Sequence, residues 1–151
     1  MRIAPFAAVL MLAVSPAVAQ DGALNESGVE KRLRDYVRVW ESDERVGPAA
    51  MQAYYADQVI YYGKSMSRRG VLADKIRFIR TYPSRSYDIA PGSVRTQCRG
   101  GECRARAILE WRRSTRAGAT QSGASELTLV FSAAAGGRIV RESARTLRGS
   151  R

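Results

Sequence analysis

Residues 68–82 have the pattern of an amphipathic helix with a charge in the middle of its packing face. At about 100° per residue, the apolar side chains gather on one arc, with Leu72, Ile76 and Ile79 along one edge and Val71, Phe78 and Tyr82 along the other. Lys75 falls between the two edges. Because a buried charge is costly unless it is paired or borders a wet cavity, the surroundings of Lys75 constrain the whole fold.

Two interpretations of Lys75 follow from this position. In the first, its stem packs in the core while the amine reaches solvent past the helix end or pairs with a structural carboxylate. In the second, Lys75 lines a pocket, where an unpaired, desolvated amine could act as a nucleophile or base. Glu142 and Glu110, both on predicted strands, are the carboxylates that could pair with it.

Two further residues are pocket candidates. Tyr62 could donate a hydrogen bond inside a cavity, although a tyrosine on a strand is usually a core or rim residue. Asp57 fits a turn or helix end, with a pocket position as the alternative. A paired Lys75 would be mainly structural, so we assign no catalytic residue.

Residues 1–19 have the features of a cleaved export signal. Arg2 precedes an apolar run, and the small residues Ala17, Val18 and Ala19 stand before Gln20. The run is short for a membrane-spanning helix, although an uncleaved anchor is the alternative. We therefore expect cleavage between Ala19 and Gln20 and a periplasmic or secreted protein. Residues 20–27 are predicted to be a disordered lead-in, 28–147 one domain, and 148–151 a tail.

The two cysteines, Cys98 and Cys103, enclose Arg-Gly-Gly-Glu. In an exported protein this spacing favours a disulfide across the mouth of a hairpin, with reduced thiols as the alternative. The chain contains no histidine, which excludes catalysis that needs an imidazole base and histidine-based metal sites. We predict no metal site and no cofactor.

The chain is strongly basic, with a formal net charge of +11. Such a charge attracts anionic surfaces, but the basic residues are spread along the chain without one dense run. A solvated basic face is the simplest interpretation, and adhesion to anionic envelope polymers is the alternative. Export argues against nucleic acid as a partner.

The order of predicted elements indicates an α+β fold. Helices are expected at residues 28–42, 48–55 and 68–82, and strands at 58–66, 84–90, 93–99, 102–113, 125–132 and 138–147, with a polar loop over 113–123. A curved antiparallel sheet wrapped around three helices would form a cone, and a cone leaves a cavity at its wide end.

Residues 55–63, YADQVIYYG, and residues 82–87, YPSRSY, resemble sequences of the nuclear transport factor 2-like superfamily. This cystatin-like α+β cone is shared by SnoaL-like proteins and ketosteroid isomerase, and the helix with Lys75 followed by residues 82–87 is similar to an exported bacterial subgroup. It covers residues 28–147 and implies the cone fold, and a homodimer through the sheet. Ketosteroid isomerase has its general-base aspartate near the end of the first strand. This chain has Tyr61-Tyr62-Gly63-Lys64 there, a segment without a carboxylate.

We therefore expect an exported, non-enzymatic binding or accessory module. It would hold a small ligand in the cone or a partner protein on the open sheet face. The first alternative is an isomerase- or hydrolase-type enzyme that uses Lys75 and Tyr62 with Glu142 or Glu110. The second is the basic protein that adheres to envelope polymers.

Overall fold

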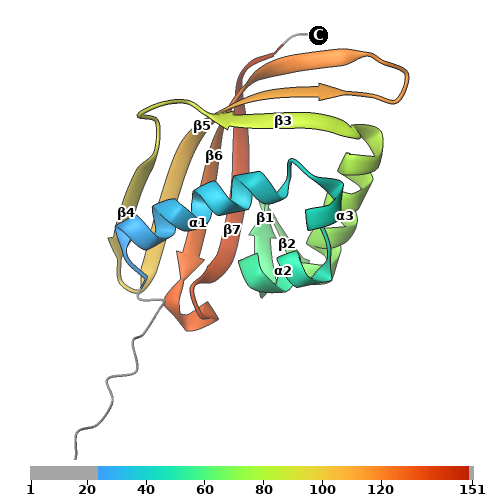
Figure 1. The fold of residues 1–151 in the computed structure, drawn as a ribbon. Coiled ribbons are helices and arrows are strands. Elements are labelled where there is room, and N and C mark those ends of the chain that lie inside the picture. The colour runs from blue at the N-terminus through green and yellow to red at the C-terminus, as the bar shows by residue number, and fades with distance from the viewer. Residues whose placement is uncertain (1–23, 150–151) are drawn as a thin grey trace, which may run out of the picture.

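The computed structural model describes residues 24–149, which form an α+β fold with an open, curved sheet (Figure 1). The helices are α1 (Glu26–Val39), α2 (Pro48–Tyr54) and α3 (Arg68–Thr81), with short 3-10 turns η1 (Asp43–Arg45) and η2 (Ala133–Ala135). The strands are β1 (Tyr55–Tyr61), β2 (Lys64–Ser67), β3 (Ser84–Ile89), β4 (Arg95–Arg99), β5 (Glu102–Ser114), β6 (Thr120–Ser132) and β7 (Arg138–Gly149). The predicted fold class is confirmed.

The strands follow the order β2-β1-β7-β6-β5-β3, and β4 pairs with the other end of β5. The described pairings are antiparallel except that of β1 with β7, which is parallel. The long strands β5, β6 and β7 form the centre of the sheet, and α1 crosses their inner face (Figure 1). The predicted signal peptide and its predicted cleavage site lie outside the described residues. Within residues 24–149, no helix is long and apolar enough to cross a bilayer.

The helix ends follow from local capping. The Asn25 side chain accepts a hydrogen bond from the Gly28 amide at 2.8 Å and so starts α1. Ser27 lies in the first turn of α1, and its hydroxyl donates to the Asn25 side chain. Glu26 and Ser27 thus belong to the helix rather than to the lead-in. Ser67 caps α3 in the same way through the Gly70 amide.

Two predicted segments differ from the structure by more than their end residues. The single strand expected at residues 58–66 is split into β1 and β2 by a tight turn in which Tyr62 and Gly63 both have positive φ, 49° and 80°. Such a two-residue turn matches the twist of antiparallel strands. The loop expected at residues 113–123 is also shorter, because β5 and β6 continue pairing to Ser114 and Thr120.

The size of the inward-facing side chains on β5 increases along the strand. Cys103, Ala105 and Ala107 are small and buried, whereas Leu109 and Trp111 are large. The small residues allow α1 to pack closely on the sheet, where its apolar face and those of β6 and β7 form the core: Val29, Leu33, Leu129, Phe131 and Ile139. The large ones lie in the part of β5 that pairs with β3.

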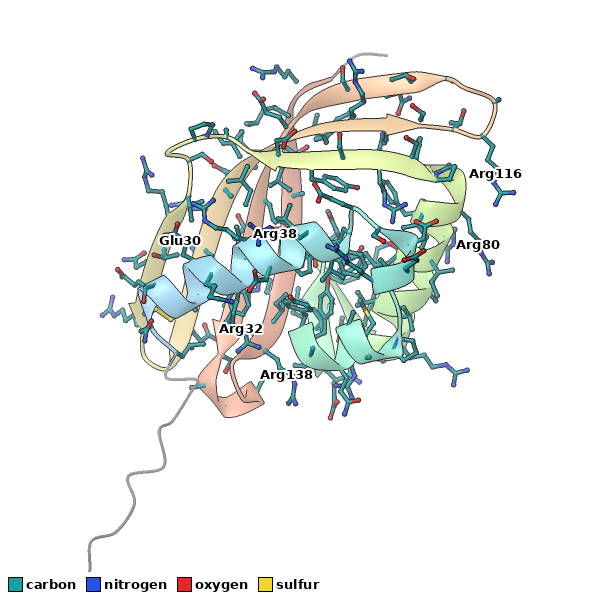
Figure 2. All side chains as sticks on the ribbon, in the orientation of Figure 1. Glu30, Arg32, Arg38, Arg80, Arg116 and Arg138 are labelled. Atoms are coloured by element: carbon teal, nitrogen blue, oxygen red, sulfur yellow. A yellow bond between two sulfur atoms is a disulfide. The ribbon has the colours of Figure 1, made fainter. Side chains whose placement is uncertain are left out.

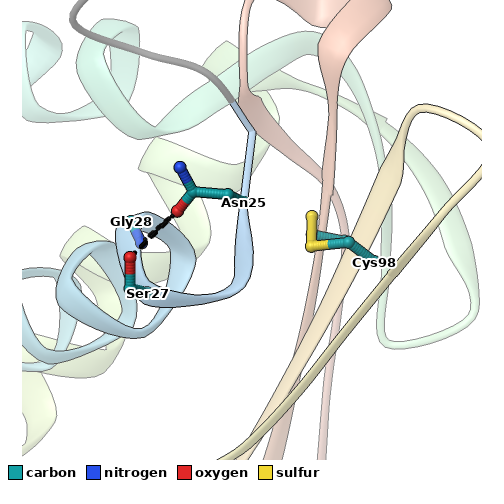
Figure 3. The surroundings of a disulfide bond; sticks show 5 residues. Asn25, Ser27, Gly28 and Cys98 are labelled. Carbon is teal, nitrogen blue, oxygen red and sulfur yellow. Dashed lines mark hydrogen bonds between the residues drawn. A yellow bond between two sulfur atoms is a disulfide. The ribbon is translucent and has the colours of Figure 1, made fainter.

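The Cys98–Cys103 disulfide is present and confirms the predicted pairing. It joins directly opposed residues of β4 and β5, and it lies beside the start of α1 at Asn25 (Figure 3). The bond therefore fastens the edge strand β4 to the centre of the sheet.

We expect reduction of this disulfide to lower the free energy of unfolding by about 2 kcal/mol, because a short closed loop restricts the unfolded chain by about that amount. Urea unfolding with and without dithiothreitol measures the change. The double variant Cys98→Ser/Cys103→Ser is the control and should not respond to the reductant. Equal stability of the oxidised and reduced protein would contradict the prediction.

Candidate functional site

A cavity of about 470 Å³ lies between α1, α3 and the inner face of the sheet. Most of its walls are aromatic or aliphatic, which is typical of small-molecule sites. The aromatic side chains that line it come from α1, from α3 and from the sheet with its turn: Tyr36, Trp40, Tyr61, Tyr62, Phe78, Tyr87 and Trp111. Trp40 and Trp111 are the two tryptophans of the chain.

Lys75 and Glu142 form a buried ion pair at one end of this cavity. Lys75 Nζ on α3 donates to Glu142 Oε1 on β7 at 2.8 Å and to the Tyr36 hydroxyl on α1 at 2.9 Å. The Lys75 side chain is 14% exposed and that of Glu142 only 1%. The charge in the packing face of α3 is thus matched by a carboxylate from the sheet.

Two tyrosines complete the shell of the Glu142 carboxylate. Its Oε2 accepts hydrogen bonds from the hydroxyl of Tyr36 at 2.7 Å and from that of Tyr55 at 2.5 Å. The two hydroxyls lie 2.8 Å apart. Burial, followed by the charge of Glu142, raises the pKa of both tyrosines well above their ordinary value. Both therefore remain hydrogen-bond donors to the carboxylate at neutral pH.

Tyr36, Lys75 and Glu142 of this cluster line the cavity, and Lys75 has its amine among the aromatic rings. Its Nζ lies 4.5 Å from the centre of the Trp40 ring and 5.4 Å from that of Tyr61, distances at which an ammonium is attracted to an aromatic face. Glu142, in contrast, is covered by its three donors. The cluster can offer a ligand a hydrogen-bond donor, but not a free carboxylate.

Asp74 is a second carboxylate of the cavity wall, one that the sequence analysis did not identify. It accepts a hydrogen bond from the Tyr61 hydroxyl at 3.2 Å. Burial, and then the Glu142 carboxylate, raises the pKa of Tyr61. This contact fixes the Tyr61 ring beside the amine of Lys75.

The structure brings together three of the predicted site residues and not the other two. Lys75, Glu142 and Tyr62 line the same cavity, with Tyr62 49% exposed at its edge. Asp57 is 87% exposed and pairs with Arg68 Nη2 at 2.7 Å outside the cavity.

Glu110 lies on the other face of the sheet and pairs with Arg148 at 2.8 Å. It is therefore not the partner of Lys75. The alternation along β5 explains this position, because Leu109 and Trp111 on either side of Glu110 face the cavity.

Tyr36 and Tyr55 are two members of the buried cluster that the sequence did not indicate. Tyr36 fits the apolar stripe of α1, and Tyr55 stands at the expected end of a helix. Their partner Glu142 lies 106 positions after Tyr36 and 87 positions after Tyr55, so no local pattern links them to it. Within residues 24–149 no group of three or more acidic or cysteine side chains could hold a metal ion.

No protein-family model matches the chain, and no curated protein matches it either. Solved structures, in contrast, do match the chain. Kfla4162 from Kribbella flavida is similar with a TM-score of 0.70 at 8% identity over 81% of this chain and 90% of that one. A nuclear transport factor 2-like superfamily protein from Salmonella enterica gives 0.65 at 12% identity, with 80% and 89% covered. The fold is that of the nuclear transport factor 2-like superfamily.

Proteins of different described activities share this nuclear transport factor 2-like fold. A candidate scytalone dehydratase from Novosphingobium aromaticivorans is similar with a TM-score of 0.66 at 10% identity, over 81% of this chain and 83% of that one. At such identities the likeness establishes the fold alone, so the function must be argued from the side chains of the cavity.

We expect Lys75→Met to lower the free energy of unfolding by about 3–5 kcal/mol, because it leaves Glu142 buried without its counter-charge. Chemical denaturation measures the loss. Lys31→Met is the matched control: Lys31 pairs with Asp35 on the surface of α1, and an exposed pair contributes less than about 1 kcal/mol. Equal effects of the two substitutions would contradict a structural role of the buried pair.

The raised pKa values of Tyr36 and Tyr55 predict a loss of stability at alkaline pH. Below about pH 10 both tyrosines are protonated whether the chain is folded or unfolded. Above it, they ionise in the unfolded chain first, so that each lowers the free energy of unfolding by up to about 1.4 kcal/mol per pH unit. Denaturation at several pH values measures this loss. Above pH 10, the free energy of unfolding of Tyr55→Phe should fall less steeply with pH than that of the unchanged protein. An unchanged slope would show that Tyr55 does not contribute.

Proposed function

We propose that the protein is an exported, non-enzymatic binding module that holds a small, flat ligand in its aromatic cavity. One observation carries this proposal: the carboxylate beside the cavity already accepts hydrogen bonds from three donors and is only 1% exposed. The cavity itself remains open, with about 470 Å³ for a ligand. The cluster of Glu142 with its three donors thus stabilises the fold and forms the wall at one end of the cavity.

The size and walls of the cavity support a ligand with a ring system. Sites for small molecules are commonly about 300–1,000 Å³ and are lined by apolar and aromatic side chains with a few polar groups. Tyr61, Trp40 and Trp111 offer ring faces and edges of this kind. The amine of Lys75 at one end could orient an oxygen atom of the ligand.

The accessibility of the cluster weighs against the alternative of an isomerase- or hydrolase-type enzyme. A general base must come within hydrogen-bond reach of the proton that it removes, and Glu142 is 1% exposed. Lys75 already donates to two oxygens and is not an unpaired amine. Turnover of a ketone or lactone that is lost in Lys75→Ala would nevertheless replace the binding function by the enzymatic one.

Two features support export. The first is the signal-like sequence of residues 1–19. The second is the Cys98–Cys103 disulfide, since such bonds persist mainly in oxidising compartments. The periplasm of a bacterium, or the medium outside the cell, is the location that we propose.

We expect the neutral probe N-phenyl-1-naphthylamine to bind in the cavity with a rise in its own fluorescence and energy transfer from Trp40 and Trp111, which both line it. Ala144→Phe adds a ring on the cavity wall and should weaken binding at least about tenfold by filling the space. Ser143→Phe is the control, because Ser143 precedes Ala144 on β7 and does not line the cavity. Absence of binding, or equal binding by the two folded variants, would overturn the proposal.

A further inference from the structure

Arg113 on β5 stands at the cavity with its guanidinium enclosed by aromatic rings. The centre of the guanidinium lies 4.3 Å from the ring centre of Tyr82, 4.8 Å from that of Trp111 and 5.6 Å from that of Phe78. Its Nε donates to the Gln121 side chain on β6 at 3.0 Å. These contacts hold the group in one orientation on the cavity wall.

The position of Arg113 differs from that of most arginines in the chain. Figure 2 shows Arg80 on α3 and Arg116 beyond the end of β5 directed away from the fold, and the side chain of Arg38 on α1 is 69% exposed. Arg113, two residues after Trp111, is on the inward face of β5 and is half-buried. A cation in such a place is only partly solvated by water, so that it gains from an anionic partner.

Arg113 is also the cation of the cavity wall that lacks a carboxylate partner in the described part of the chain. Lys75 pairs with Glu142, and Arg85 pairs with Asp43. The hydrogen-bond partner of Arg113 is instead the neutral amide of Gln121. Its two Nη groups have no hydrogen-bond partner among residues 24–149, and they form the fork that matches the two oxygens of a carboxylate.

Arg85 adds positive charge at the same end of the cavity. It is directly opposite Arg113 in the pairing of β3 with β5 and lines the same cavity. Its side chain is held by the Trp40 carbonyl at 2.6 Å and by Asp43, and its buried Nη2 has no partner within the described residues. The carboxylates of the cavity wall, Glu142 and Asp74, are in contact with Lys75 and Tyr61 instead.

We propose that the ligand is an aromatic acid whose carboxylate binds the two Nη groups of Arg113 while its ring packs among the aromatic side chains of the cavity. This inference rests on the proposed binding function and names the chemical class of the ligand. Because Arg113 is already stacked and hydrogen-bonded, little side-chain freedom is lost on binding. The rings around it keep part of the water away from the ion pair, and Arg remains charged at any physiological pH.

The test compares 2-naphthoate with its neutral isostere 2-naphthamide as competitors of bound N-phenyl-1-naphthylamine. We expect 2-naphthoate to displace the probe at a concentration about 10- to 100-fold lower, the range for a hydrogen-bonded charged group. Arg113→Met keeps the apolar stem and should abolish the difference between the two compounds. Arg112→Met removes the same charge from the opposite, exposed face of β5 and should preserve the difference.

The outcomes separate this inference from the binding function. If N-phenyl-1-naphthylamine binds and both competitors displace it equally well, the cavity is a binding site but the anion selectivity is refuted. The inference is also refuted if Arg112→Met abolishes the preference as strongly as Arg113→Met does, because the effect is then one of net charge. If the probe does not bind in the cavity, the proposed function itself fails. Urea unfolding of each variant verifies that it is folded.

Discussion

The carboxylate of Glu142 is the point at which four distant parts of the chain meet. Lys75 reaches it from α3, Tyr36 from α1 and Tyr55 from the start of β1. A buried charge demands partners, and each of these partners can be supplied only when its helix or strand has the right place and rotation. The cluster therefore fixes how α1 and α3 lie against the sheet, and with them the shape of the cavity.

The sequence contained part of this arrangement. A lysine in the apolar arc of residues 68–82 requires a buried partner or a cavity, and the structure provides both for Lys75. The choice between Glu142 and Glu110 depends on which face of each strand turns inward. Side chains alternate between the two faces of β5. Because Leu109 and Trp111 line the cavity, Glu110 between them lies on the opposite face.

Other features could not be derived from local patterns. The turn at Tyr62 and Gly63 divides β1 from β2 because Tyr62 takes a positive φ, which few residues other than glycine adopt. The hydroxyls of Tyr36 and Tyr55 meet Glu142 only through long-range packing. Arg113 is one basic residue among many in a basic chain, and its aromatic surroundings come from α3 and the residue that follows it as well as from β5.

The inward-facing side chains of β5 increase in size along the strand, so that one part of it serves the stability of the fold and the other the choice of ligand. Ala105 and Ala107 are small and buried in the core, whereas Leu109, Trp111 and Arg113 line the cavity. Related chains could therefore exchange the residues of the wide end of this strand and accept molecules of other shapes or charges. The end of β5 that carries Ala105 and Ala107 would keep the scaffold unchanged while the ligand diversified.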